Sequence, residues 1–156
     1  MRTRAKTLGV EGLVRETLKL CSVDASRIDP AVVEAQIALG HERSEFAWTH
    51  KAFLEAARSL LRRLARREKF LASLQRISCP TLIIQGDKDR LVPLAATRAV
   101  AESRPDWTLE VFEDIGHIPQ LEAPERWLAS VNRWLDGAGK AAVAISAADR
   151  IRTASR

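Results

Sequence analysis

Cysteine is scarce in this sequence, and long apolar runs are absent. Only two cysteines, Cys21 and Cys79, occur among 156 residues, and they show neither CxxC nor any other metal-ligand spacing. We therefore expect free, buried thiols in a reducing cytoplasm rather than a disulfide. No apolar run approaches the ~20 residues that span a bilayer, and no apolar signal region follows the basic N-terminal residues. The expected location is the cytoplasm, without a membrane span.

Histidine is also scarce, which bears on metal binding. The three histidines are His41, His50 and His117. The segment that begins at His41 resembles the helical zinc motif H-E-x-x-H, but its fifth position is Glu45. No cysteine or histidine is spaced to complete a site. The sequence therefore predicts no metal and no cofactor, and surface positions for His41 and His50.

The composition is that of an ordinary globular domain, with 46% hydrophobic and 29% charged residues and a net charge of +5. Much of the positive charge lies in one segment, in Arg58, Arg62, Arg63, Arg66, Arg67 and Lys69. Apolar residues recur at helical spacing in the same stretch: Phe53, Leu54, Ala57, Leu60, Leu61 and Leu64. This pattern predicts an amphipathic helix with a packed apolar side and solvated arginines. Since no aromatic residues alternate with the charges, nucleic acid is not an expected partner.

The first half of the chain carries only helical patterns. Asp29 followed by Pro30 is a helix start, and Gly40 is a possible end. The expected helices cover residues 10–20, 30–40, 49–69 and, briefly, 70–74. From residue 77 the pattern changes to strand, helix, strand, helix. The strands are expected at 81–85 and 108–112, and the helices at 94–103 and from Pro124 to a cap at Gly137. An alanine-rich tail, expected to be flexible, follows at 138–156.

Two loops follow the two expected strands. The first reads G-D-K-D-R-L-V-P over residues 86–93, and the second reads G-H-I-P-Q-L-E-A-P-E over residues 116–125. The carboxyl ends of parallel strands are where α/β sheets bind ligands. Together the loops resemble the C-terminal part of the α/β-hydrolase family, whose motifs are G-x-x-D-x-x-V-P for the catalytic acid and G-H-x-P-x-x-E-x-P-E for the histidine. The resemblance covers about residues 77–136.

The resemblance implies a role for two of these residues. Asp89 would be the acid and His117, 28 residues later, the base. A hydrogen bond of about 2.6–3.2 Å should then join them, while Asp87 stabilises the turn or faces solvent. Glu122 and Glu125 receive no catalytic role. The implied fold class is α/β: a partial α/β-hydrolase fold with a helical cap-like region (1–76) and a short parallel strand-helix-strand-helix core (77–137).

The family's nucleophile motif, G-x-S-x-G, is missing. No two of the seven glycines are four residues apart, so no such elbow exists in this sequence. The HGGG-type oxyanion loop is missing as well. The chain also has no tyrosine, which disfavours the epoxide hydrolases of the family, since these use cap tyrosines. By elimination the resemblance favours an esterase or lipase-like serine hydrolase acting on a small apolar ester, ahead of a C–C bond hydrolase.

Three functional hypotheses remain open. In the first, Asp89 and His117 complete a catalytic triad whose serine lies on another polypeptide or upstream frame. In the second, the chain is a non-catalytic truncated remnant or a pseudo-enzyme that acts as a binding or assembly partner. A basic helical protein for nucleic acid or membrane ranks last. Two strands are too few for a stable open sheet, so the open edge of the first strand predicts a homodimer or a complementary polypeptide.

Overall fold

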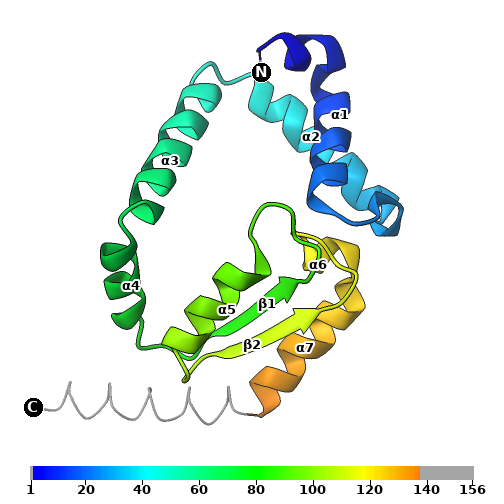
Figure 1. The fold of residues 1–156 in the computed structure, drawn as a ribbon. Coiled ribbons are helices and arrows are strands. Elements are labelled where there is room, and N and C mark those ends of the chain that lie inside the picture. The colour runs from blue at the N-terminus through cyan, green and yellow to red at the C-terminus, as the bar shows by residue number, and fades with distance from the viewer. Residues whose placement is uncertain (1, 138–156) are drawn as a thin grey trace, which may run out of the picture.

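The computed structural model describes residues 2–137 and shows a helical first half followed by a small α/β unit (Figure 1). The helical half contains α1 (Arg2–Cys21), the 3-10 turn η1 (Ala25–Arg27), α2 (Pro30–Ser44), α3 (Thr49–Leu64) and α4 (Arg67–Gln75). The α/β unit contains β1 (Leu82–Gly86), α5 (Leu94–Ser103), β2 (Thr108–Phe112), α6 (Pro119–Glu122) and α7 (Pro124–Asp136). The tail predicted at 138–156 lies outside the described residues.

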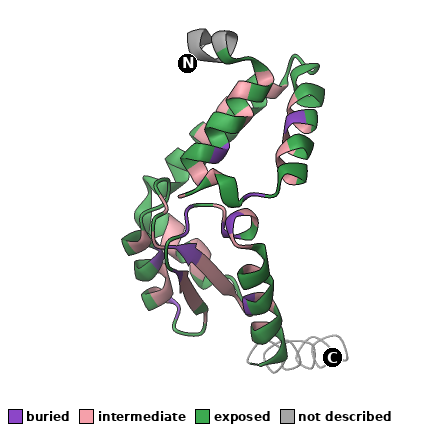
Figure 2. Ribbon diagram, turned by 90° about the vertical axis from the view of Figure 1, so that its right-hand side faces the viewer, coloured by how far each residue is buried: buried purple, intermediate pink, exposed green. Residues whose placement is uncertain are grey.

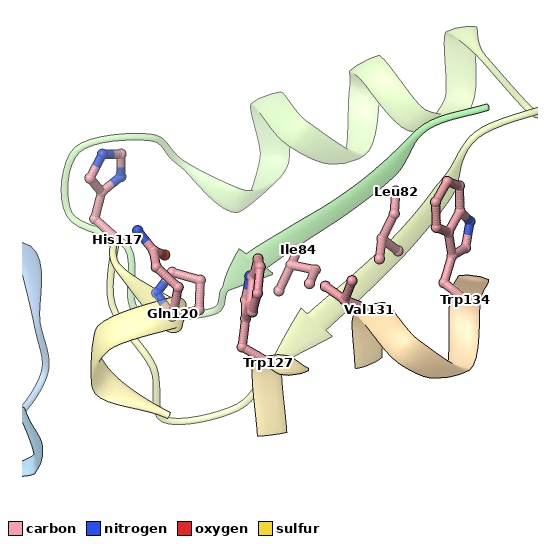
Figure 3. Close-up of a pocket in the computed structure, with 8 residues that line it drawn as sticks. Leu82, Ile84, His117, Gln120, Trp127, Val131 and Trp134 are labelled. Carbon is pink, nitrogen blue, oxygen red and sulfur yellow. The ribbon is translucent and has the colours of Figure 1, made fainter. Parts of the chain in front are cut away.

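The α/β unit is built on one parallel strand pair. Leu82 of β1 lies opposite Thr108 of β2, and Gly86 lies opposite Phe112, so both strands end at the same edge. The helices α5 and α7 cover opposite faces of this pair (Figures 1 and 3). Phe112, at the end of β2, is fully buried. This arrangement confirms the predicted fold class, a partial α/β-hydrolase fold. Among the described residues, no partner strand pairs with the other edge of β1.

The helices α1 and α2 form a packed pair. Ile37 of α2 and Leu18 of α1 are both buried. Asp29 caps α2, since its carboxylate accepts a hydrogen bond from the Ala31 amide at 2.7 Å. The predicted end at Gly40 is wrong, because the helix continues to Ser44. A Cβ at Gly40 would lie 2.8 Å from Cγ1 of Val10, so this glycine serves the close approach of α1 rather than a helix end.

The helix α1 is longer than the 10–20 segment that the apolar pattern predicts. It begins at Arg2 and is interrupted at Gly9, which has a positive φ of 63°. A glycine adopts this left-handed conformation without steric cost, so it separates the first turns from the predicted segment. No described helix is long and apolar enough to cross a membrane.

The predicted helix at 49–69 is two helices in the structure. Arg66 leaves the helical conformation (φ −99°, ψ 69°), and α4 begins at Arg67. The predicted packing of the apolar side of α3 is also wrong: Phe53 is 67% exposed and Leu61 is 65% exposed. The helix stands apart from the sheet (Figure 1), and no described residue covers this face.

Few side chains are fully buried. The buried hydrophobic residues are Leu18, Ile28, Ile37, Phe112 and Ile115. Figure 2 shows that buried residues gather where the turn after α1 meets the ends of the strands. Both cysteines are free, as predicted, but neither is buried: Cys21 is half-buried and Cys79 is exposed.

Candidate active site

The loop after β1 fixes the Asp89 carboxylate from several sides. Its Oδ1 accepts hydrogen bonds from the amides of Leu91 and Val92, at 2.7 and 2.9 Å. Its Oδ2 accepts one from Nε2 of Gln85 at 2.9 Å. Side-chain to backbone bonds of this kind are the usual reason for aspartate in a tight turn. The turn therefore leaves the carboxylate little freedom to rotate.

The loop after β2 brings His117 to this carboxylate. Because Gly86 and Phe112 are paired in the parallel register, both loops leave the sheet at the same edge. Nδ1 of His117 lies 2.8 Å from Oδ2 of Asp89, which is within the predicted range. The backbone amide of His117 donates to the carbonyl of Cys21 at 2.6 Å. The histidine loop is thus held against the end of α1 as well as against Asp89.

The close approach of the two loops depends on glycine. A Cβ at Gly86 would lie 2.1 Å from the carbonyl oxygen of Gly116 and 2.3 Å from that of Ile115. A Cβ at Gly116 would lie 2.4 Å from the carbonyl oxygen of Cys21. Neither position has room for a larger residue, so the glycine of each motif permits the backbone contact that places Asp89 beside His117.

The environment keeps Asp89 ionised. Its side chain is only 4% exposed. Burial raises the pKa of the Asp89 carboxyl, but the hydrogen bonds from Val92, His117, Leu91 and Gln85 outweigh it and hold the pKa below its ordinary value. An ionised carboxylate at Nδ1 favours the tautomer that carries its proton there. Nε2 then has a free lone pair.

The His117 side chain is partly exposed to solvent. The side chain is 38% exposed, and its Nε2 has no hydrogen-bond partner within the described part of the chain. Figure 3 shows the ring on its loop, beyond the strand ends and apart from the apolar side chains near α7. His117 can therefore accept a proton at Nε2 from a group that approaches from the solvent side. Asp89 can then stabilise the resulting imidazolium.

Asp87 does not compete for the histidine. Its Oδ1 accepts a hydrogen bond from the Asp114 amide at 2.7 Å, and its Oδ2 lies 3.1 Å from Nζ of Lys88. It joins the two loops at Asp114, which has a positive φ of 57°. Asp87, which was predicted to stabilise its own turn or face solvent, thus links the first loop to the second.

Glu122 is a site residue that the sequence interpretation missed. Its side chain is fully buried and accepts hydrogen bonds from the Gly116, Val23 and Asp24 amides. The only signal in the sequence was its position in the histidine motif, since its partners at 23 and 24 are 98–99 residues away. Glu125, in contrast, is exposed in the first turn of α7.

An apolar groove lies between β1 and α7. It has a volume of about 390 Å³. Its lining residues are Leu82, Ile84, His117, Pro119, Gln120, Trp127, Val131 and Trp134. Figure 3 shows Leu82 and Ile84 of β1 facing Trp127, Val131 and Trp134 of α7. His41 and His50 are exposed, and no cluster of metal-ligating side chains occurs among residues 2–137.

The fold and this pair of loops define a class: a parallel α/β layer with a buried acid and a histidine at the carboxyl ends of neighbouring strands. The chain belongs to the α/β-hydrolase family. The family model described as alpha/beta hydrolase fold matches residues 35–124, which is more than half of the chain. The recognition made from the two loop motifs is therefore confirmed.

Known relatives match parts of this chain. Over 64 residues it is 39% identical to the candidate carbamate hydrolase RutD of Caulobacter sp. (strain K31), covering 41% of this chain and 24% of that protein. Over 54 residues it is 43% identical to the pimeloyl-[acyl-carrier protein] methyl ester esterase of Aromatoleum aromaticum, covering 35% of this chain and 22% of the esterase.

A solved structure shows the same fold. The crystal structure of a candidate lipase from Acinetobacter baumannii AYE superposes with a TM-score of 0.62 at 21% identity. The match covers 86% of this chain and 44% of that protein. The chain thus spans less than half the length of this structure.

Proposed function

We propose that Asp89 and His117 are the acid and general base of a hydrolase that cleaves carboxylic esters. The observation that carries the proposal is the 2.8 Å contact between a buried, multiply hydrogen-bonded carboxylate and a histidine whose side chain is 38% exposed. The nucleophile would come from a polypeptide segment other than these 156 residues, because the sequence contains no G-x-S-x-G.

The geometry supports a separate role for each of the two residues. Nε2 of His117 would take the proton of a serine hydroxyl as the oxygen attacks the ester carbonyl carbon. Asp89 would hold the ring through Nδ1 and stabilise the imidazolium. The same Nε2–H would then protonate the leaving alcohol. In the second half of the reaction, Nε2 would activate the water that hydrolyses the acyl intermediate.

The substrate class is inferred from the relatives. The two relatives reported above are named for a carbamate and for a methyl ester, and both groups have a carbonyl carbon bonded to a heteroatom leaving group. Esterase and lipase names among the relatives favour an ester. The exposed apolar side of α3 favours a small apolar acyl group over a charged one.

The partner would be the polypeptide that carries the nucleophile. One edge of β1 is unpaired among the described residues, and the groove beside it is lined with apolar side chains. A parallel strand added there would extend the sheet and cover Leu82 and Ile84. The matched crystal structure is more than twice as long as the matched region, which favours a complementary segment over a second copy of this chain.

The test uses the chain purified with its partners from native cells through an affinity tag. A fluorophosphonate probe, which labels activated serines, should label a polypeptide that contains G-x-S-x-G, and the assembly should hydrolyse nitrophenyl esters. Changing His117→Ala should remove both labelling and turnover. Recovery of an assembly without a probe-reactive serine would favour the alternative, a non-catalytic assembly partner. Labelling that is indifferent to His117→Ala would contradict the proposal.

A further inference from the structure

Glu122 is a buried carboxylate outside the acid–histidine pair. It ends α6, five residues after His117, and its side chain is 0% exposed. Oε1 accepts hydrogen bonds from the amides of Val23 and Asp24, at 2.8 and 3.0 Å. Oε2 accepts one from the Gly116 amide at 2.8 Å. A carboxylate this deeply buried requires such donors, since burial without them strongly disfavours the charged form.

The cationic group nearest to Glu122 strengthens this arrangement. NH1 of Arg27 lies 3.7 Å from Oε1 of Glu122. The same guanidinium donates to the carbonyl of Asp114 at 2.8 Å and forms an ion pair with its carboxylate at 2.6 Å. Arg27 therefore joins the turn after α1 to the start of the histidine loop. The carboxylate of Glu122 makes a second connection between the same two segments.

We propose that Glu122 is a positioning residue for His117. One of its oxygens holds the turn after α1, and the other holds the amide immediately before the histidine. The next amide, that of His117 itself, is bound by the Cys21 carbonyl of the same turn. Two consecutive amides of the histidine loop are thus fixed on the turn, and this sets the direction in which the His117 side chain leaves the backbone.

This inference rests on the proposed function in one respect: only a catalytic His117 requires such precise placement. The hydrogen bonds that join Glu122 to the turn after α1 and to the histidine loop are present whether or not His117 is catalytic. Because the turn belongs to the helical half, Glu122 connects the position of α1 with the Asp89–His117 contact. Loss of the link should release the imidazole from Asp89 without altering α2 or the strand pair.

The experiment follows the His117 ring in the full chain by NMR with ¹⁵N-labelled histidine. His117→Ala assigns its signals among the three histidines. In the wild type, the ring nitrogens should report a single tautomer with the proton on Nδ1. Glu122→Gln is nearly isosteric, but it places an amide NH₂ against backbone N–H groups. The expected result is a mixture of tautomers for His117, with unchanged backbone signals for α2 and β1.

Glu125→Gln is the matched control, because this exposed carboxylate is three residues away, and it should leave the His117 signals unchanged. A folded Glu122→Gln chain with the wild-type His117 tautomer would overturn the proposal. If Glu122→Gln does not fold, hydrogen exchange of the wild type decides: slow exchange of the Val23, Asp24 and Gly116 amides supports the bridge, and rapid exchange at Gly116 overturns it. The readout needs no substrate, so it separates this proposal from the proposed function.

Discussion

Asp87 and Asp89 lie two residues apart on one loop, yet their side chains bind different partners. Asp89 accepts the Leu91 and Val92 amides at one oxygen and faces His117 with the other. Asp87 reaches the Asp114 amide instead. Residue type does not distinguish them. The direction in which the backbone of the turn presents each side chain decides which carboxylate is available to the histidine.

The Asp89 carboxylate should make stability depend on pH. Its pKa is lower in the folded chain than the unfolded value of about 3.9. Its contribution is therefore fully present above pH ~4 and is lost as the pH falls through the folded pKa. Asp89→Asn should lower the free energy of unfolding by about 1–3 kcal/mol at neutral pH. That difference from the wild type should shrink below pH ~4, as measured by urea unfolding.

Asp87→Asn is the matched control for this measurement, since the Asn oxygen can still accept the Asp114 amide. Asp87→Asn should lower the free energy of unfolding at neutral pH by less than Asp89→Asn does. Equal losses for the two variants would mean that the hydrogen bonds around Asp89 contribute no more than those of the neighbouring carboxylate.

Among the single helices and strands, the sequence predicted those whose bounds are set by residues within or next to the segment. The helix at Leu94–Ser103 and the strand at Thr108–Phe112 have the expected bounds, because their signals are local: Pro105 lies two residues after the helix, and the alternating pattern lies within the strand. The break at Arg66 was missed, since neither glycine nor proline marks it. Gly40 was misinterpreted because its role is a contact with a distant helix.

The same distinction applies to the site. The motifs singled out Asp89 and His117 because each lies on a loop directly after a strand, and the structure brings these two side chains together. Glu122 could not be found in this way. Its hydrogen bonds reach back to the turn after α1, and no pattern in the sequence shows which distant amides a buried carboxylate will bind.

The junction of the two loops should tolerate no added methyl group. Gly86→Ala would bring a Cβ to 2.1 Å from a backbone oxygen, and backbone atoms cannot move aside as a flexible side chain can. The expected loss in the free energy of unfolding is at least about 1–3 kcal/mol. Gly137→Ala is the comparison, because its Cβ would lie 3.3 Å from the Arg133 carbonyl oxygen, a tight contact that a small shift relieves. Thermal unfolding of both variants measures the difference, and equal stability would contradict the close approach.

The exposed apolar side of α3 should contribute little to the stability of the isolated chain. Leu60 and Leu61 are 58% and 65% exposed. Leu60→Gln with Leu61→Gln should change the free energy of unfolding by no more than about 0.5 kcal/mol. Ile37→Ala, in the contact between α1 and α2, should lower it by about 2–5 kcal/mol. A large loss in the α3 variant would show that this face is packed in solution. Chemical denaturation followed by circular dichroism provides the comparison.

At the scale of the whole molecule, the open edge of β1 should promote association. An unpaired strand beside an apolar groove is a template for a second chain. Light scattering should give a mass above the 17.3 kDa of one chain, increasing with concentration. Ile84→Lys should reduce association, because charge on an edge strand opposes pairing. Leu128→Lys, at an exposed position of α7 outside the groove lining, should not. A stable, monodisperse wild-type monomer would contradict this prediction.

The isolated chain should show no triad-type hydrolysis. An imidazole held by a carboxylate is a base, and covalent catalysis also needs a nucleophile within its reach. No serine lies in a G-x-S-x-G elbow, and within the described residues Nε2 of His117 contacts no hydroxyl. Direct activation of water would still lack preorganised oxyanion donors, each of which contributes about 3–4 kcal/mol in serine hydrolases.

The measurement is hydrolysis of short- and medium-chain nitrophenyl esters by the purified chain, with His117→Ala in parallel. We expect both proteins to match the rate of buffer alone. Turnover that disappears in His117→Ala would show that a serine or a water is activated within these residues, whereas equal turnover in both would indicate a contaminant. Adding the polypeptide that carries the nucleophile should raise the rate only with the wild-type chain. The rate would then depend on Asp89 as well, and Asp89→Asn should lower kcat by roughly 10⁴-fold, as the corresponding change does in serine proteases.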